Sequence, residues 1–230
     1  MWLTAPEKTV RACREVLLPD ETARADKFTL ERLRSQYQIS QGGLRLLLSR
    51  YLRCHPRELT FIFGHRGKPA LGDSEPQFNL SNSGGLSVYA FTVGCEVGVD
   101  VEKVEPLADL EYLASQYFCK AENAELSSID TKSAAQEAFF RCWTRKEAYI
   151  KAVGTGLYLP LDQFQVTLLG NDPPRFVHIA QSASVADEWT LQHLHPAPGY
   201  VGALAYHACA RTVVVREPLT PDELLEQAAN

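Results

Sequence analysis

The order of elements in the sequence predicts an α+β fold. Helical patterns precede short strand-like runs in residues 1–103, and the same order returns in residues 104–230. The chain breaks between the two sets at residues 104–106, where valine, glutamate and proline follow one another. We therefore predict an N-terminal subdomain of residues 1–103 and a C-terminal subdomain of residues 104–230, although no repeat is visible residue by residue.

The first half begins with residues 1–10, in which we expect a first strand. Residues 20–27 follow a proline and predict a short helix, and residues 30–52 predict a longer one that Gly42 and Gly43 interrupt. Its core side is formed by four leucines: Leu44, Leu47, Leu48 and Leu52. Several arginines and lysines make this region basic, which is most often the mark of a solvated helix face.

Short β-like runs complete the first half at residues 60–63 and 77–80 and in two further segments. We expect residues 86–93 to pair with residues 96–101 as a hairpin, because a glycine and a cysteine separate them. The serine, asparagine and glycine residues at 81–85 offer hydroxyls and backbone N–H groups of the kind that cradle phosphate. A plain β-turn is an equally good interpretation.

The second half predicts helices at residues 109–118 and 133–153. Five strands are expected after them: residues 164–169, 175–179, 189–194, 200–206 and 212–215. Residues 120–129 are polar, and they form either a mobile segment where a protein partner docks or an ordinary surface connection. Residues 218–230 predict a terminal helix, and we expect His193 and His195 to lie on the surface.

The composition excludes several classes of protein. A chain of 230 residues that is 45% apolar can bury one large core or two small ones. Its net charge of −5 argues against a general nucleic-acid-binding protein. No segment approaches the roughly 18 apolar residues of a membrane span, and no signal peptide is evident, so we expect a cytoplasmic protein without a membrane partner. The six cysteines lack zinc spacing, and we expect reduced thiols.

One candidate site motif is the run GVDVE at residues 98–102, which follows Val97 and alternates apolar and acidic residues. In a strand, Asp100 and Glu102 point to the same face with roughly 7 Å between them along the strand. A wetted edge strand would have the same pattern. Joined by a third carboxylate, however, the pair would be suitable hard ligands for Mg²⁺.

The second motif is the run WTRKEAYIK at residues 143–151, inside a helix that glycines end at residues 154–156. Trp143, Glu147 and Lys151 are four residues apart, so successive members drift by only about 40° around the helix and share one ridge. An ordinary surface ion pair of Glu147 with Lys151 is the alternative interpretation.

Together the two motifs resemble, in sequence and spacing, those of the long, Sfp-like 4′-phosphopantetheinyl transferases. Weaker similarities extend over residues 24–169 and include Arg45, the run GKP at residues 67–69 and FNLSNS at residues 78–83. The resemblance implies transfer of 4′-phosphopantetheine from coenzyme A to a serine of an apo acyl or peptidyl carrier protein, with release of 3′,5′-ADP. It also implies two similar subdomains related by a pseudo-twofold axis, an active site in the cleft between them, and a monomer.

The resemblance further implies roles for individual residues. Asp100, Glu102 and Glu147 would hold Mg²⁺ against the pyrophosphate of coenzyme A. Glu147, or a metal-bound water, would accept the serine proton, and Lys151 would contact the pyrophosphate. Trp143 would pack rather than react.

The remaining coenzyme A contacts implied by the resemblance are Arg45, Lys68, Ser81, Asn82 and Ser83, besides Asp100, Glu147 and Lys151. Asn82 departs from the family, which usually has histidine there, a residue expected to touch the 3′-phosphate. A neutral amide can donate a hydrogen bond at this position but cannot add positive charge.

Two other functions stay open from the sequence. The same fold could serve as a non-catalytic adaptor, in which the acidic residues form a solvated patch. It could also carry another Mg²⁺-dependent phosphotransferase activity, although the chain has no phosphate-binding loop of the GxxxxGK[ST] type.

Overall fold

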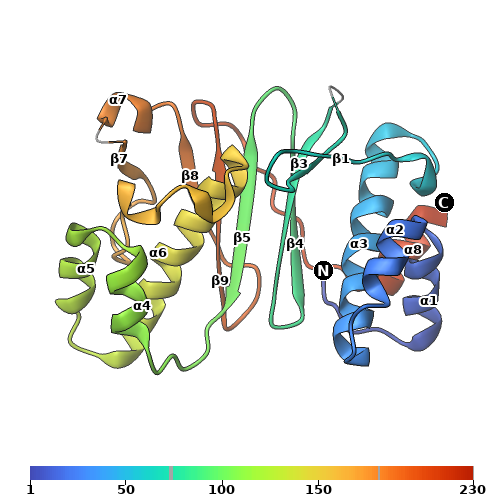
Figure 1. Ribbon diagram of the computed structural model, residues 1–230, viewed down its shortest axis with the longest axis horizontal. Coiled ribbons are helices and arrows are strands. Elements are labelled where there is room, and N and C mark those ends of the chain that lie inside the picture. The colour runs from blue at the N-terminus through green and yellow to red at the C-terminus, as the bar shows by residue number, and fades with distance from the viewer. Residues whose placement is uncertain (73–74, 181, 230) are drawn as a thin grey trace.

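The computed structural model describes residues 1–72, 75–180 and 182–229, and it confirms the predicted α+β class. Strands β3, β4, β5 and β9 occupy the middle of the molecule, with α3, α1, α2 and α8 on one side and α6, α4 and α5 on the other (Figure 1). The elements in chain order are α1 Glu7–Glu15, α2 Pro19–Ala25, α3 Glu31–Leu52, η1 Pro56–Glu58, β1 Ile62–Phe63, β2 Pro69–Ala70, β3 Gln77–Ser83, β4 Leu86–Thr92, β5 Val97–Lys103, α4 Leu110–Tyr117, α5 Lys120–Ser127, α6 Lys132–Val153, η2 Gly156–Tyr158, η3 Leu161–Gln163, β6 Phe164–Val166, β7 Phe176–Ile179, α7 Ala183–Ala186, β8 Thr190–Leu194, β9 Tyr200–Tyr206 and α8 Pro221–Ala229.

The N-terminal residues differ from the prediction. The expected strand over residues 1–10 is wrong, since only Trp2 forms an isolated bridge, to Leu86, and Glu7–Glu15 is helical. The expected interruption of the long helix is also wrong, because α3 runs straight through its two glycines. A β-carbon at Gly42 would lie 2.7 Å from the carbonyl oxygen of Cys13, so this glycine lets α1 pack closely on α3.

The strands pair differently from the predicted hairpin. β4 pairs with β3, with Ser83 opposite Leu86 beside a tight glycine turn. β5 pairs instead with β9, which comes about one hundred residues later in the chain, and places Asp100 opposite Ala203. The predicted pairing of residues 86–93 with residues 96–101 is therefore wrong, because the backbone partner of β5 is distant in sequence.

The sheet that contains β3 and β4 meets the sheet that contains β5 and β9 through side chains of β3 and β5. The Oδ1 of Asn79 accepts a hydrogen bond of 2.9 Å from the backbone N–H of Val99. Ser81 and Ser83, which follow Asn79 at intervals of two, continue the same row along β3 and contact β5 as well. This row of polar side chains joins β3 to β5, whose ladder partner β9 comes from the second half of the chain.

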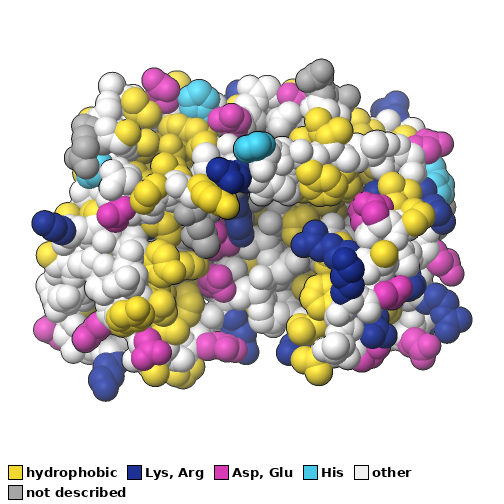
Figure 2. All heavy atoms as spheres, viewed as in Figure 1, with side chains coloured by type: hydrophobic (Ala, Val, Ile, Leu, Met, Phe, Trp, Pro, Cys, Tyr) yellow, Lys and Arg dark blue, Asp and Glu magenta, His cyan; other side chains and the backbone are white. Residues whose placement is uncertain are grey.

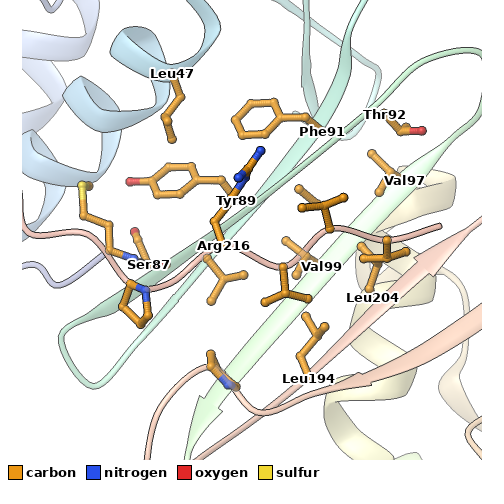
Figure 3. A pocket seen from close by; sticks show the side chains of 18 of the residues that line it. Leu47, Ser87, Tyr89, Phe91, Thr92, Val97, Val99, Leu194, Leu204 and Arg216 are labelled. Atoms are coloured by element: carbon orange, nitrogen blue, oxygen red, sulfur yellow. Dashed lines mark hydrogen bonds between the residues drawn. The ribbon is translucent and has the colours of Figure 1, made fainter. Parts of the chain in front are cut away.

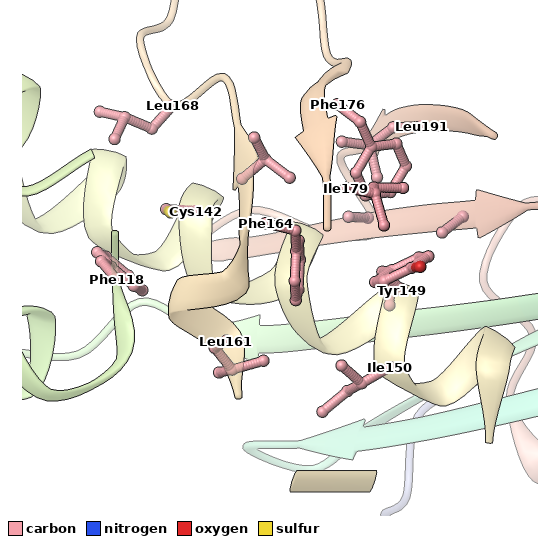
Figure 4. Packing of buried hydrophobic residues seen from close by; sticks show 14 of the residues in the cluster. Phe118, Cys142, Tyr149, Ile150, Leu161, Phe164, Leu168, Phe176, Ile179 and Leu191 are labelled. Atoms are coloured by element: carbon pink, nitrogen blue, oxygen red, sulfur yellow. The ribbon is translucent and has the colours of Figure 1, made fainter. Parts of the chain in front are cut away.

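α6 packs on β5 and β9 and forms the centre of the largest core (Figure 4). The ring of Tyr149 lies edge-on to Phe164 and Phe176, with ring centroids 4.9 and 5.1 Å away. Gly98 lies under the helix, because a β-carbon there would collide with the backbone of Ala148 and Ala152. The glycine of the run GVDVE therefore sets how closely α6 approaches β5.

The end of the chain returns to the first half. The expected strand at residues 212–215 is wrong, since residues 207–220 cross the sheet without regular structure. The predicted terminal helix is present as α8, although residue 230 of that prediction lies outside the described residues. α8 packs on α1 and α3, where Asp222 accepts a hydrogen bond from Thr9 and Gln227 accepts one from Arg50.

Two further expectations concern absences. Over the described ranges 1–72, 75–180 and 182–229, no helix is long and apolar enough to cross a membrane. All six cysteines are free thiols, as predicted.

Candidate active site

The face of β5 that meets α6 carries the acidic residues singled out from the sequence. Asp100 is only 2% exposed, and its Oδ1 lies 2.5 Å from the Nζ of Lys151, which projects from the last turn of α6. The same ammonium donates a 2.9 Å hydrogen bond to the Oγ of Ser81. Glu102 and Glu147 are half-buried beside this pair. Figure 2 shows that this face is hollowed between the α6 side and the α3 side, with acidic and basic side chains in the hollow.

Burial raises the pKa of all three carboxyl groups. The pKa of Asp100 is raised by burial, against which Lys151 and Ser81 act. Burial likewise raises the pKa of Glu102, with a further increase from Asp100. Glu147 is affected strongly, because burial and then the charge of Asp100 raise its pKa from 4.5 to about 7. The charge of Asp100 therefore disfavours ionisation of both glutamates, and an added cation would be stabilised among the three groups.

The donor set fits a hard divalent cation. The Oδ2 of Asp100 is buried and has no hydrogen-bond partner among the described residues. Within those residues, no group of three His, Cys, Asp or Glu side chains is close enough to form a metal centre by itself. Mg²⁺ does not need one, since it commonly uses one or two carboxylates and completes its shell with water and substrate phosphate.

Ser81, Asn82 and Ser83 separate onto the two faces of β3, as alternation in a strand requires. Ser81 and Ser83 face β5 and its carboxylates. Asn82 faces the other way, and its Oδ1 accepts hydrogen bonds from the hydroxyls of Ser40 in α3 and Ser87 in β4. Of these three side chains, β3 therefore directs only those of Ser81 and Ser83 toward the face that bears Asp100.

Arg45 does not lie at this site. Its side chain is 1% exposed, and its Nε donates a 2.7 Å ion-pair hydrogen bond to Glu21. Its Nη1 donates to the carbonyl oxygens of Pro56 and Leu59, at 2.8 and 3.0 Å. The predicted contact of Arg45 with coenzyme A is not supported by this geometry, because the guanidinium is buried and joins α2, α3 and η1.

Lys68 also has protein partners. Its Nζ donates to the carbonyl oxygens of Val97, at 3.0 Å, and Ala152, at 2.7 Å. Burial lowers the pKa of Lys68 from 10.5 to about 8. The predicted phosphate contact of Lys68 is likewise not supported, since its ammonium connects the β1–β2 loop to the start of β5 and the end of α6.

A buried ion pair in the second half escaped the sequence analysis. Lys146 and Glu122 are both 0% exposed, and their Nζ and Oε2 atoms are 2.8 Å apart. Lys146 also donates to the carbonyl oxygens of Leu161 and Phe164. The signal was available, because Lys146 lies at helical spacing from the buried Cys142 and Ile150 on the core side of α6.

This pair adds to the interpretation of residues 120–129. The segment is ordered as α5, Lys120–Ser127, which lies at the surface and buries Glu122. Docking of a protein partner on this segment stays a prediction. The carboxylate of Glu122 also accepts hydrogen bonds from the backbone N–H groups of Cys119 and Val166. Glu122 therefore connects the start of α5 to α6, through Lys146, and to β6, through Val166.

Trp143 packs, as expected. Its ring stacks on Phe139, with centroids 6.1 Å apart, and lies edge-on to Tyr117. A hydrogen bond from its side chain also lowers the pKa of Glu102, against the larger effect of burial. Trp143 thus packs on the aromatic residues of the core and also lies beside Glu102, one of the three acidic residues of the site.

A cavity of about 780 Å³ lies on the opposite, valine-bearing face of β5 (Figure 3). Val97, Val99 and Leu204 form its floor, and residues 211–219 cross it. The acidic residues and Lys151 do not line this cavity, so it is separate from the site on the α6 face.

Comparison with known proteins identifies relatives of this chain. Residues 96–205 match the family model described as the 4′-phosphopantetheinyl transferase superfamily. The 4′-phosphopantetheinyl transferase HetI of Nostoc sp. strain PCC 7120 is 34% identical over 207 residues, which cover 88% of this chain and 84% of HetI. The chain belongs to the 4′-phosphopantetheinyl transferase superfamily.

Other members of the superfamily match a smaller part of the chain. The 4′-phosphopantetheinyl transferase Sfp of Bacillus subtilis is 36% identical over 126 residues, which cover 54% of each protein. Among solved structures, the ACPS-CoA complex of Chronobacterium ammoniagenes is 20% identical and has a TM-score of 0.39, covering 51% of this chain and 99% of that one. The matches to the family model, HetI and Sfp confirm the sequence resemblance to the long, Sfp-like type of transferase.

Proposed function

We propose that this chain transfers the 4′-phosphopantetheine group from coenzyme A to a serine of an apo acyl or peptidyl carrier protein, giving the holo carrier and 3′,5′-ADP. The proposal rests on membership of the superfamily. The observation that carries it is the contact of Lys151 with Asp100, beside Glu102 and Glu147, in a hollow between the two halves of the chain.

The reaction is a phosphoryl-type transfer, and these side chains match its requirements. The serine oxygen forms a bond to the phosphorus that carries pantetheine, and the bond from that phosphorus to 3′,5′-ADP breaks. Glu147 accepts the serine proton, because burial raises the pKa of its carboxyl group and makes the carboxylate more basic than that of an exposed glutamate. Lys151 offsets the charge that grows on the departing phosphate.

A divalent cation, for which Mg²⁺ is our proposal, would bind among Asp100, Glu102 and Glu147, with one or two of these carboxylates as ligands and water and substrate phosphate completing its shell. When bound, it would neutralise charge on the pyrophosphate. The unpartnered Oδ2 of Asp100 is the atom that most favours this assignment. Asn82, whose side-chain oxygen is held by two hydroxyls, keeps its amide N–H groups as neutral donors for the nucleotide end of coenzyme A. We further propose a cytoplasmic monomer with the site in the cleft between its two subdomains.

Intact mass spectrometry tests the function. The protein is incubated with coenzyme A, Mg²⁺ and a panel of apo acyl and peptidyl carrier proteins, with parallel samples that contain EDTA in place of Mg²⁺. We expect at least one carrier to gain the mass of one phosphopantetheine, in the Mg²⁺ samples only. If no member of the panel gains this mass, the proposed activity is wrong and an adaptor role becomes the better explanation. A gain of equal size with EDTA would contradict the cation assignment alone.

A further inference from the structure

Two serines of β3 contact the acidic residues of β5 one for one. The Oγ of Ser81 donates a 2.8 Å hydrogen bond to Oδ1 of Asp100, and the Oγ of Ser83 donates a 2.7 Å hydrogen bond to Oε2 of Glu102. Ser81 is only 6% exposed, and Ser83 is half-buried. Since residues two apart in a strand share a face, both contacts follow from one register of β3 against β5.

Each of these hydroxyls also accepts one hydrogen bond, and this fixes the direction of its proton. Ser81 accepts from the ammonium of Lys151 at 2.9 Å, and Ser83 accepts from the backbone N–H of Lys103 at 3.1 Å. Ammonium and amide groups can only donate, and an ionised carboxylate can only accept. The single hydroxyl proton of each serine is therefore directed at a carboxylate and is not available to a phosphate oxygen.

We propose that Ser81 and Ser83 are positioning residues for Asp100 and Glu102, rather than contacts to the phosphates of coenzyme A. Ser81 holds Oδ1 of Asp100, which leaves the unpartnered Oδ2 for a cation. Ser83 holds one oxygen of Glu102 against the backbone of β5. This inference rests on the proposed function in one respect, since it takes these carboxylates to bind a divalent cation.

The test measures cation affinity directly, without turnover. Mn²⁺, which is paramagnetic, is titrated into the protein without coenzyme A, and free Mn²⁺ is followed by electron paramagnetic resonance. Loss of a group that orients a metal ligand typically weakens binding 10- to 100-fold. We expect Ser81→Ala and Ser83→Ala each to weaken Mn²⁺ binding about tenfold, in line with that range. The variants Ser81→Thr and Ser83→Thr, which keep the hydroxyl, should stay within about threefold of the wild type.

The matched control is Asn82→Ala, which changes the same strand on its opposite face and should leave Mn²⁺ affinity unchanged. Steady-state kinetics complete the comparison, because a positioning role leaves the KM for coenzyme A at saturating Mg²⁺ unchanged in the serine variants. An unchanged Mn²⁺ affinity in both alanine variants would overturn the inference, whether or not the KM for coenzyme A rises. If the wild-type protein does not bind Mn²⁺, the inference also fails, while phosphopantetheine transfer measured by mass would leave the proposed activity standing. Thermal melts identify any variant that is not folded, and Ser83, being half-buried, provides the test if the Ser81 variant unfolds.

Discussion

Gly98 of β5 lies directly against the backbone of Ala148 in α6, with no room for a β-carbon between them. Glu147 and Lys151 flank this alanine on the same helix, and Asp100 lies two residues beyond the glycine on the same strand face. This close contact of helix and strand therefore lies beside the residues to which we assign the reaction. The glycine sets the distance over which the Lys151 ammonium reaches Asp100.

The variant Gly98→Ala tests this spacing. The added methyl group must push α6 away from β5, and overpacking of this kind typically costs about 1–3 kcal/mol. We expect the melting temperature to fall by several degrees and transfer activity to be lost in protein that is still folded. Differential scanning calorimetry and the mass assay measure the two effects. Gly64→Ala is the control, because a β-carbon there makes only an ordinary contact of 3.6 Å with the carbonyl oxygen of Lys68.

The variant Glu147→Gln tests the proton acceptor. It keeps the size of the side chain and most of its hydrogen-bonding capacity, but removes the negative charge and the basicity. We expect kcat to fall by about 10²- to 10⁴-fold, the range typical of a lost general base. Rapid-quench or mass-based kinetics at saturating Mg²⁺ and coenzyme A give the value. A rate close to that of the wild type would assign the proton to another acceptor.

Glu147 should also make folding stability depend on pH. Its pKa is raised from 4.5 to about 7 in the folded protein, so the folded state holds the proton more tightly than the unfolded state does. The resulting stabilisation is complete below pH 4.5 and is lost as the pH rises through about 7. In EDTA, the melting temperature of the wild type should therefore fall over this range relative to that of Glu147→Gln. Parallel melting curves of the two proteins would contradict the assignment.

A variant of Arg45 tests whether this residue stabilises the fold or contacts coenzyme A. The variant Arg45→Met leaves the buried carboxylate of Glu21 without its cationic partner, with only the backbone N–H of Leu18 still donating to it, and it removes the Arg45 donors from the carbonyl oxygens of Pro56 and Leu59. Breaking a buried ion pair from one side typically costs about 3–5 kcal/mol, so we expect a loss of this size in urea unfolding, with the KM for coenzyme A unchanged in the folded protein. Arg32→Met, at an exposed position of α3, should have little effect on either quantity. The opposite result, normal stability with a raised KM, would restore Arg45 as a contact to coenzyme A.

Asn82 is the place where the chain departs from its family at a position expected to meet substrate. A charge-assisted hydrogen bond is roughly twice as strong as a neutral one, so a histidine should gain on the order of 1 kcal/mol with the 3′-phosphate. We expect Asn82→His to lower the KM for coenzyme A several-fold and to leave dephospho-coenzyme A, which lacks that phosphate, unaffected. Equal changes for both substrates would mean that residue 82 acts through its contacts with Ser40 and Ser87 instead.

Elements with a strong local pattern were predictable from the sequence. The long helix of the second half was expected at residues 133–153 and is observed as α6, Lys132–Val153. The strand at residues 200–206 matches β9, whose residues are all buried. The side of β5 that bears Asp100 and Glu102 also followed from alternation alone, because a strand has only two faces.

The predictions that the structure does not support concern properties that depend on distant parts of the chain. Residues 212–215 have the composition of a strand, yet they have no ladder partner within the described structure and lie across a cavity. β5 follows β4 after a turn, but its backbone pairs with β9. This pairing depends on the arrangement of the whole sheet and not on the residues near β5 in the sequence. The burial of Arg45 could not be predicted from the sequence either. A basic residue beside leucines in a helix has the same local pattern whether its side chain faces solvent or a buried glutamate.

Each half of the chain packs against a strand or helix of the other half, and this limits where the gene could be divided into two fragments. A fragment that ends at residue 103 would carry β5 without β9, its only ladder partner among the described strands, and the complementary fragment would carry α8 without α1 and α3. Neither piece would hold a finished hydrophobic core, so each should be insoluble when expressed alone and soluble when the two are produced together. Such mutual dependence would make the pair a natural split reporter, in which the appearance of transferase activity signals that two fused proteins have met.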